Sequence, residues 1–470
     1  TSTAAKPSAQ SASLPIAPVS MTVEQVDNYH GTMVSDPYRW LEQDNPESQQ
    51  WVETQRQYTE SYLNTLPARE SYKARLTELW NYERFGVPEE AGGKYFYYYN
   101  NGLQNQSVLY TQANKNAEGT ILLDPNTLSG DGTVALSGTE ISKNGRYLAY
   151  GVSKSGSDWQ TWFVRDIKSG KDLNDKIEWV KFSTTTWTPD EKGFYYARYD
   201  APKSGEELSG QNYFHKLYFH KVGTPQSADI LVYQRPDQKE WGFDSRISDD
   251  GHWLIISASQ GTDVRNRVFL KALTGKDRTV KALIPELEAE YDFIGSEGSV
   301  LYFKTNKDAP KGKVIAIDVK KFPNLQRQDV VAESVNTLRE VLFAGNRLVL
   351  SYLKDAVSHV EVRNLKGALE YTFTLPNLGT ARDFSGSKKS TELFYSLSSY
   401  VQATSVYRFD LNSKTNELYR SPKVAFNAND FVSEQVFYTS KDGTKVPMIL
   451  NYKKGLQKTA STPTLLYAYG

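Results

Sequence analysis

The sequence predicts a mainly β-structured protein built around a seven-fold repeat, and three observations support this prediction. Aromatic residues make up 13% of the 470 residues, which favours β-strands. From about residue 93 onward, apolar and polar residues alternate with a period of two. Two short motifs then recur about every 50 residues: a turn that leads into an apolar strand, and a second strand that ends in a polar turn.

The repeat contains seven copies of each motif. The central residues of the second motif are Tyr110, Phe163, Tyr218, Phe269, Ile315, Glu361 and Tyr407. One repeat is long enough for four short strands, which is the content of one propeller blade. We therefore expect a seven-bladed β-propeller over residues 84–432. The period-two pattern excludes a solenoid of helix pairs.

A helical segment precedes the repeat. Apolar residues at helical spacing predict two helices, over residues 46–64 and 67–81. Asn45 is expected to cap the first helix, and Pro46 to occupy its first position. Because two amphipathic helices cannot bury their apolar faces by themselves, we expect them to pack on another part of the protein.

The two ends of the chain differ from its middle. Residues 1–20 are rich in Ser, Ala, Thr and Pro, so we expect a mobile tail. Such a tail is typical of what signal-peptide cleavage leaves, which predicts a periplasmic or secreted protein, with a cytoplasmic one as the alternative. Residues 432–452 predict a hairpin with an Asp-Gly turn, and residues 464–469 a buried strand. We interpret these segments as the start of a further domain in a longer polypeptide.

Composition narrows the function classes. Lys plus Arg and Asp plus Glu number 55 each, so the formal net charge is zero, which argues against nucleic-acid binding through bulk charge. The chain has no Cys, which excludes disulfides, thiolate metal sites and Cys nucleophiles. No run of about 18 apolar residues predicts a membrane span. Neither nucleic acid nor a membrane is therefore an expected partner.

The chain carries no complete catalytic or cofactor motif. G-x-S-x-G, H-E-x-x-H, the P-loop and G-x-G-x-x-G are all absent, so we expect no metal and no cofactor. The acidic run at 248–250 is interpreted as a turn rather than as a calcium site. The histidines are interpreted as solvated or satisfied residues of the blades; they are His30, His215, His220, His252 and His359.

Several segments, in order along the chain, carry a resemblance to a known family. They read DPYRWLE (36–42), GLQNQSVLY (102–110), LDPNTLSGDGTVAL (123–136), SGSDW (155–159), VKFSTTTW (180–187), HKLYFHKVGT (215–224), SKDGTKVPM (440–448) and LLYAYG (465–470). With these segments the chain resembles the prolyl oligopeptidase family of serine peptidases. The resemblance implies a seven-bladed propeller joined to an α/β-hydrolase domain. Residues 433–470 would start that domain, and residues 21–83 would pack on it.

The resemblance also implies an activity. Members of the family are serine endopeptidases that cleave short peptides after proline, in a cavity between the two domains. The propeller admits short peptides and excludes folded proteins. The family's Ser-His-Asp triad would lie beyond residue 470, so no residue of this chain is assigned to it. Short proline-containing peptides are the expected partners, and the protein is expected to be a monomer.

Two residues match functional positions of the family. Tyr469 matches a tyrosine whose hydroxyl donates to the oxyanion, with a buried strand tyrosine as the alternative. Phe182 matches an aromatic residue that lines the subsite beyond the proline pocket, with a core phenylalanine as the alternative. Three further subsite positions depart from the family, because Gly242, Ser259 and Thr262 stand where it has Met, Arg and Cys. We therefore expect recognition by the propeller to be altered or weaker.

Two other function classes stay open. A non-catalytic propeller scaffold, in effect a pseudo-enzyme, would need no nucleophile, although the chain carries no WD-type repeat signature. A propeller glycosidase would need two inward carboxylates, and the sequence singles out no such pair.

Overall fold

The computed structural model describes residues 16–469, and the chain divides into two compact units, residues 1–81 and 82–470. Most of the predicted tail therefore lies outside the described residues, and its last five residues, 16–20, form no helix or strand. The predicted domain boundaries at residues 83/84 and 432/433 stay predictions.

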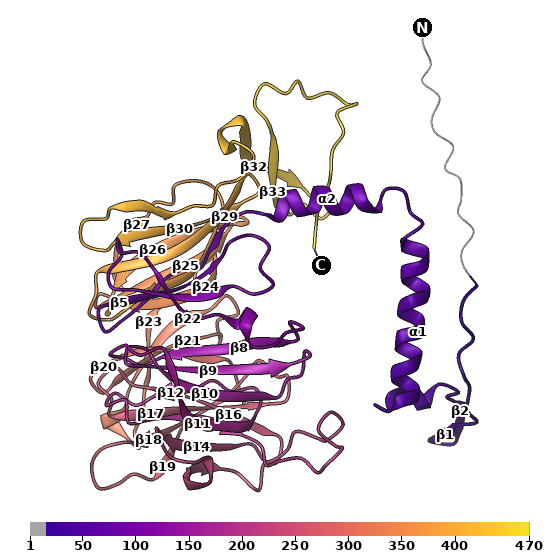
Figure 1. Ribbon diagram of the computed structural model, residues 1–470. Helices are drawn as coiled ribbons and strands as arrows, with labels where there is room; N and C mark the ends of the chain where they lie inside the picture. The colour runs from indigo at the N-terminus through magenta and orange to yellow at the C-terminus, as the bar shows by residue number, and fades with distance from the viewer. Residues whose placement is uncertain (1–15, 470) are drawn as a thin grey trace. The chain divides into compact units, whose positions relative to one another are not determined.

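The first unit contains a small hairpin and two α-helices (Figure 1). Strands β1 (Val26–Tyr29) and β2 (Thr32–Ser35) pair antiparallel. The short helix η1 (Arg39–Glu42) precedes α1 (Pro46–Leu63), and α2 spans Arg69–Trp80.

The predicted capping chemistry sets the start of α1. Asn45 Oδ1 accepts a hydrogen bond from the Ser48 N–H at 2.9 Å, and Ser48 Oγ accepts one from the Asn45 N–H at 3.2 Å. This reciprocal pair satisfies two backbone donors, and it confirms the prediction of a helix that begins at Pro46. The second helix begins later than predicted. Pro67 lies in a turn that the Arg69 N–H closes on the Leu66 carbonyl at 3.1 Å.

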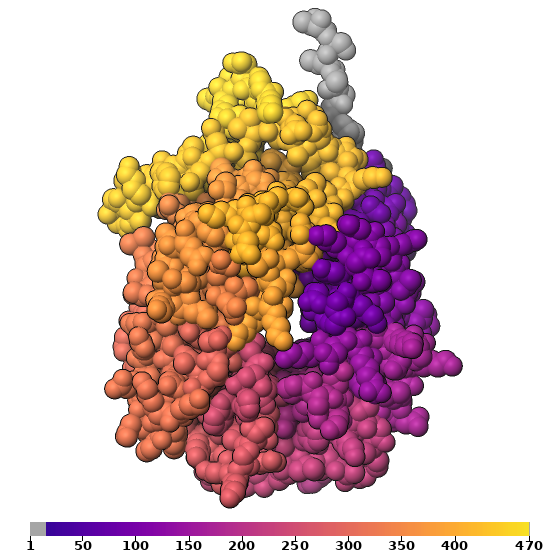
Figure 2. Space-filling model, turned by 90° about the vertical axis from the view of Figure 1, so that its left-hand side faces the viewer, coloured from indigo at the N-terminus to yellow at the C-terminus, as the bar shows by residue number. Residues whose placement is uncertain are grey.

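Within the second unit, residues 84–420 form seven antiparallel sheets, six with four strands and one with five. These are the seven blades of the predicted propeller, and Figure 2 shows them following one another round a ring in chain order. Blade 1 has β3 (Arg84–Phe85), β4 (Glu89–Ala91), β5 (Lys94–Asn100), β6 (Val108–Gln112) and β7 (Thr120–Leu123). Blade 2 has β8 (Val134–Ile141), β9 (Tyr147–Lys154), β10 (Gln160–Asp166) and β11 (Lys171–Val180). Blade 3 has β12 (Thr186–Trp187), β13 (Gly193–Arg198), β14 (Lys216–Lys221) and β15 (Ile230–Gln234).

The remaining blades have the same order of strands. Blade 4 has β16 (Trp241–Ile247), β17 (Trp253–Gln260), β18 (Arg267–Ala272) and β19 (Val280–Ile284). Blade 5 has β20 (Tyr291–Glu297), β21 (Val300–Thr305), β22 (Lys313–Asp318) and β23 (Arg327–Val331). Blade 6 has β24 (Thr337–Ala344), β25 (Arg347–Lys354), β26 (Val357–Asn364) and β27 (Leu369–Phe373). Blade 7 has β28 (Thr380–Gly386), β29 (Glu392–Ser399), β30 (Gln402–Asp410) and β31 (Asn416–Arg420).

The two sequence motifs form β5 and β6 in blade 1 and the second and third strands of the other six blades, and the prediction of a seven-bladed propeller is confirmed. Apolar side chains fill the space between neighbouring blades. Phe96 and Leu109 of blade 1, for example, share one buried cluster with Leu148 and Tyr150 of blade 2. Burial of these faces between blades provides the hydrophobic core that no single four-stranded sheet has.

The acidic run at 248–250 forms a turn, as predicted. Ser248 Oγ donates to Asp250 Oδ1 at 2.6 Å, and the Gly251 N–H donates to the Ser248 carbonyl at 2.8 Å. Asp249 Oδ2 accepts from the Ser296 N–H at 2.6 Å, which joins blade 4 to blade 5. The carboxylates therefore satisfy backbone and hydroxyl donors.

The first and last blades meet without exchanging a strand. Polar side chains join them instead. Tyr95 Oη donates to Glu392 Oε1 at 2.6 Å, and Lys115 Nζ lies 3.2 Å from Glu392 Oε2. Tyr419 Oη in turn donates to the Lys115 carbonyl at 2.7 Å.

The structure of the segment after blade 7 agrees only in part with the prediction from the sequence. Strands β32 (Phe431–Thr439) and β33 (Lys445–Lys453) form the predicted hairpin. The prediction of a buried strand at residues 464–469 is wrong, because Leu465 and Leu466 are 91% and 81% exposed and form no strand. A strand needs a neighbour for its backbone groups, and β32 and β33 pair only with each other.

Candidate substrate-facing site

One face of blades 3 and 4 carries the residues that the sequence singled out. Four connections lie on it: residues 181–185 before β12, 199–215 before β14, 235–240 before β16 and 261–266 before β18. We call this surface the Phe182 face. The chain also enters the propeller before β3 and leaves it after β31 on this face, because the first strand of each blade starts there.

Phe182 lies between β11 and β12, and its side chain is 61% exposed. The alternative of a core phenylalanine is therefore wrong. Its backbone has a φ of 53°, in the left-handed region that bulky residues rarely adopt. The flanking Lys181 and Ser183 are buried, and Ser183 Oγ accepts from the Ala197 N–H at 2.9 Å. The neighbours thus hold the strained backbone and present the aromatic ring at the surface.

An aromatic cluster lies beside Phe182. The ring of Trp159 meets Trp179 edge-on at 5.6 Å and Tyr199 edge-on at 6.2 Å. The ammonium of Lys181 lies 4.1 Å from the centre of the Trp159 ring and donates to Asn212 Oδ1 at 3.2 Å. Burial lowers the pKa of Lys181. The three rings form a packed apolar surface, and the Lys181 ammonium lies at its edge.

His215 connects this cluster to blade 4. Its ring stacks on Tyr199 at 4.4 Å, and its Nδ1 accepts a hydrogen bond from the Phe243 N–H at 2.9 Å. Because Nδ1 is an acceptor, the ring proton is on Nε2. Burial lowers the pKa of His215 to about 4, with the carbonyls of Ala197 and Lys181 opposing part of the effect. His215 is therefore a neutral, structural histidine at neutral pH. The interpretation as a solvated or satisfied residue is wrong for it, because it is buried and its Nε2 has no hydrogen-bond partner among residues 16–469.

The structure brings two of the departing positions together. Gly242 on β16 and Ser259 on β17 are cross-strand neighbours, and Ser259 Oγ donates to the Gly242 carbonyl at 3.4 Å. A Cβ atom at residue 242 would lie 2.9 Å from Ser259 Oγ and 3.7 Å from His215 Nδ1. Thr262 lies apart from them, in the turn after β17. The absence of side-chain bulk at residue 242 leaves this part of the Phe182 face open.

A cavity of about 220 Å³ adjoins His215 on the same face. Its charged groups are paired with one another or with a neighbouring residue. Lys216 Nζ bonds both carboxylate oxygens of Asp200, at 2.8 and 2.6 Å, and Arg235 pairs with Asp237 at 2.6 Å. The cavity therefore suits an uncharged segment of a ligand better than an ion. Its lining residues are Asp200, Phe214, His215, Lys216, Gln234, Arg235 and Pro236.

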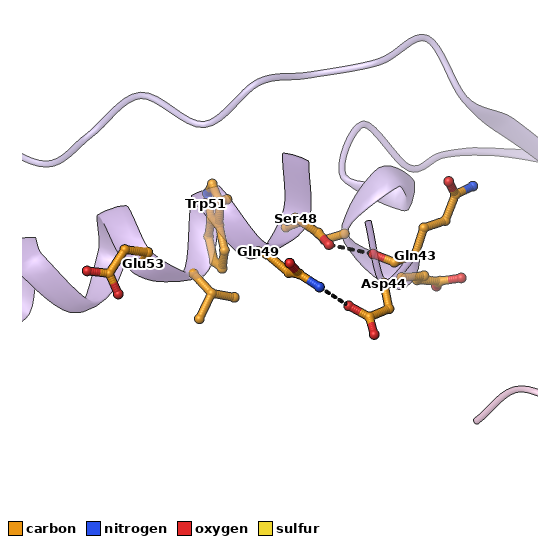
Figure 3. Close-up of a pocket in the computed structure, with 9 residues that line it drawn as sticks. Gln43, Asp44, Ser48, Gln49, Trp51 and Glu53 are labelled. Atoms are coloured by element: carbon orange, nitrogen blue, oxygen red, sulfur yellow. Dashed lines mark hydrogen bonds between the residues drawn. The ribbon is translucent and has the colours of Figure 1, made fainter. Parts of the chain in front are cut away.

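A larger cavity, of about 410 Å³, lies in the first unit at the start of α1 (Figure 3). Its polar groups are satisfied locally: Ser48 Oγ donates to the Gln43 carbonyl at 2.6 Å and Gln49 Nε2 to Asp44 Oδ1 at 2.9 Å. All its lining residues come from residues 41–53, and it contains none of the predicted site residues.

Tyr469 is 93% exposed. The alternative of a buried strand tyrosine is therefore wrong for this structure, and the oxyanion role stays a prediction. Sequence reasoning missed the contacts that join Trp159, Tyr199 and His215. The signal for them was present, because Trp159 and His215 lie in two of the segments that carry the family resemblance.

Among residues 16–469, no group of three or more His, Asp or Glu side chains could hold a metal ion. None of the helices in this part of the chain has the length and hydrophobicity of a membrane-spanning helix.

The blades and the site define the class of the protein: a seven-bladed β-propeller with an exposed aromatic residue on the face where the chain enters and leaves. The chain belongs to the prolyl oligopeptidase family, because the sequence pattern described as "Prolyl oligopeptidase, N-terminal beta-propeller domain" matches residues 18–422.

Curated relatives and solved structures agree with this assignment. The chain is 38% identical over 466 residues to the prolyl endopeptidase of Elizabethkingia meningoseptica, a match that covers 98% of this chain and 65% of the relative. It is 32% identical to prolyl oligopeptidase A of Amanita bisporigera, over 95% of this chain and 64% of the relative. The chain thus spans slightly less than two thirds of the length of these relatives.

The propeller also resembles solved structures. A prolyl endopeptidase from a study of inter-domain dynamics in catalysis and specificity matches with a TM-score of 0.75 and 37% identity, over 94% of this chain and 64% of that one. Prolyl oligopeptidase B of Galerina marginata, bound to a 25-residue macrocyclization substrate, matches with a TM-score of 0.83 and 30% identity, over 94% and 66% of the two chains.

Proposed function

We propose that the protein is the propeller-bearing part of a serine endopeptidase that cleaves short peptides on the C-terminal side of proline. The observation that carries this proposal is the 38% identity, over nearly the whole chain, to a relative named prolyl endopeptidase. The peptide-bound relative from Galerina marginata supports a peptide as the ligand class. The catalytic triad is assigned to a part of the polypeptide outside this chain.

The Phe182 face has the chemistry that such a peptide needs. An exposed ring at Phe182 offers an apolar surface to a substrate side chain, and the paired charges of the neighbouring cavity leave room for an uncharged backbone. Gly242 and Ser259 make this surface more open than bulkier residues would. We therefore propose weak side-chain selection by the propeller, with proline selected by the rest of the enzyme.

Four related points belong to the same proposal. The propeller would admit short peptides and exclude folded proteins. The protein would act as a monomer. It would be periplasmic or secreted, with a cytoplasmic protein as the alternative. Tyr469 would donate its hydroxyl to the oxyanion of the tetrahedral intermediate.

Kinetics on the full-length polypeptide test this proposal. A fluorogenic Gly-Pro amide should be hydrolysed, and the matching Gly-Ala amide should not. Tyr469→Phe should lower kcat by up to about 100- to 1000-fold with little change in KM, since the phenol bonds the charged transition state most strongly. Peptide binding without any hydrolysis would favour the alternative, a non-catalytic scaffold.

A further inference from the structure

A second histidine, His220, lies at the far end of β14 from His215 and is fully buried between two carboxylates. Its Nε2 lies 2.8 Å from Asp175 Oδ1, and its Nδ1 lies 2.6 Å from Asp229 Oδ1. Tyr196 Oη donates to the other Asp229 oxygen at 2.6 Å. The side chains of His220, Asp175 and Asp229 are 0%, 0% and 1% exposed. We call these four residues the imidazole cluster.

With both carboxylates ionised, the two short contacts determine how many protons the ring carries. An ionised carboxylate only accepts hydrogen bonds, and a neutral imidazole has only one N–H to donate. A neutral ring would therefore place one nitrogen lone pair against a carboxylate oxygen, in surroundings that water does not reach. Two protons on the ring satisfy both contacts and reduce the charge of the cluster from −2 to −1, which the dry interior favours.

The cluster joins two blades. Asp175 is on β11 of blade 2, whereas His220 is on β14 and Asp229 directly precedes β15, both in blade 3. Asp175 Oδ1 also accepts from the Gly223 N–H of blade 3 at 2.6 Å. A charged hydrogen bond between His220 and Asp175 therefore crosses the interface between the two blades.

We propose that His220 is a doubly protonated imidazolium that fastens blade 2 to blade 3, and that loss of its proton at alkaline pH loosens this interface. The proposal concerns the propeller itself and does not depend on the proposed peptidase activity.

The electrostatic surroundings agree with the geometry. Burial lowers the pKa of His220. The hydrogen bonds and charges of Asp175 and Asp229 together have a larger, opposite effect, so that the pKa is raised to about 9. The remaining groups nearby are the phenol of Tyr196 on β13, on which the charge of Arg198 acts, and the uncharged ring of Phe194 at 5.1 Å. Because the folded-state pKa is above the value near 6.5 of an unfolded histidine, the stabilisation is complete below about pH 6.5 and is lost as the pH rises toward 9.

Loosening of the interface should reach the Phe182 face. Asp175 is on the strand that ends at Val180, two residues before Phe182, and His220 is on the strand that begins directly after His215. The imidazole cluster thus fastens together the two strands whose other ends carry the candidate site. Residues 181–185 should become more mobile when the ring loses its proton.

Hydrogen exchange tests the proposal on the protein at pH 7.5 and pH 9. After correction for the intrinsic exchange rate, protection of amides in β11 and residues 181–185 should fall about 10- to 30-fold between the two values, while β21 and β22 of blade 5 stay constant. His220→Gln should abolish this pH dependence, whereas His252→Gln, at an exposed histidine paired with Asp250 at 3.0 Å, should keep it.

Asp229→Asn keeps the shape of the cluster and provides a second readout if His220→Gln does not fold. It should move the loss of protection to lower pH by at least one unit, because one of the two carboxylates that favour the charged ring is gone. The proposal is overturned if wild-type protection in blades 2 and 3 does not depend on pH beyond that of blade 5. It is also overturned if either His220→Gln or Asp229→Asn shows the wild-type pH profile.

Discussion

His215 directly precedes strand β14, and His220 lies within it. Both side chains are buried, yet their surroundings favour opposite charge states. His215 stacks on Tyr199 and accepts from a backbone N–H, and burial lowers its pKa to about 4. His220 meets a carboxylate at each nitrogen, and its pKa is raised to about 9. The comparison teaches that burial alone does not decide the charge of a histidine; the groups that its two nitrogens meet do.

Removal of a carboxylate beside His220 should give the largest effect on stability. Asp175→Ala leaves a buried imidazolium with one partner fewer and breaks the contact between blades 2 and 3. The free energy of unfolding should fall by about 3–5 kcal/mol. Chemical denaturation at pH 7 measures the change.

The control for this variant is an exposed aspartate. Asp190 pairs with Lys192 at 3.3 Å, and its side chain is 54% exposed. Asp190→Asn should cost less than about 1 kcal/mol, because solvent screens the pair. Equal losses in the two aspartate variants would remove the distinction between the buried and the exposed carboxylate.

The free energy of unfolding should contain two pH-dependent contributions, one from each histidine, that change with pH in opposite directions. His220 contributes stability below about pH 6.5 that is lost as the pH rises toward 9. His215, whose folded-state pKa is depressed, contributes stability above about pH 6.5 that is lost as the pH falls toward 4. Each contribution should change the free energy of unfolding by up to about 3 kcal/mol, since one pKa unit corresponds to about 1.4 kcal/mol.

Subtracting the stability of a histidine variant from that of the wild type separates the contribution of that histidine from those of other titrating groups. The stability of the wild type minus that of His220→Gln should fall with rising pH between about 7 and 9. The same difference for His215→Gln should fall with decreasing pH between about 6 and 4. Parallel pH profiles for the wild type and both variants would contradict this assignment.

Much of the fold could be predicted from the sequence, because it depends on local and repeated patterns. The seven blades follow from the alternation and spacing of apolar residues, and the start of α1 follows from Asn45 and Pro46. Whether residues 464–469 form a strand could not be predicted in this way, because an apolar run becomes a strand only where another strand pairs with it.

The candidate site could be predicted only in part. Resemblance singled out Phe182, but its exposure depends on a left-handed backbone that no sequence pattern indicates. The charge of His220 depends on Asp175 and Asp229, which the fold brings to the ring from two other segments of the chain. Contacts between such distant residues leave no periodic signal in a single sequence.

Substitution of Phe182 should affect the site without affecting the fold. Phe182→Ala removes an exposed ring, so the free energy of unfolding should change by no more than about 0.5 kcal/mol. In the full-length polypeptide, KM for an oligopeptide should rise several-fold with little change in kcat, because the ring would bind ground state and transition state alike. Leu418→Ala, at a 57% exposed residue of β31, should leave both constants unchanged. An unchanged KM for Phe182→Ala would remove the residue from the proposed site.

Gly242→Ala should have a smaller effect on substrate binding than Phe182→Ala. The added Cβ would meet Ser259 Oγ at 2.9 Å, and this hydroxyl can rotate away, so a stability loss below about 1 kcal/mol is expected. If the open surface beside His215 receives substrate, KM for peptides with bulky side chains should rise more than KM for peptides with small ones. A uniform change across both peptide sets would contradict that role.

The contrast between the two histidines can be measured most directly by nitrogen-15 NMR of histidine-labelled protein, with His215→Gln and His220→Gln to assign the signals. The two rings should titrate in opposite directions from the ordinary value near 6.5. His220 should carry protons on both nitrogens at pH 7.5 and lose one near pH 9, while His215 should carry a single proton, on Nε2, down to about pH 4. Titration of both rings near pH 6.5 would contradict the account.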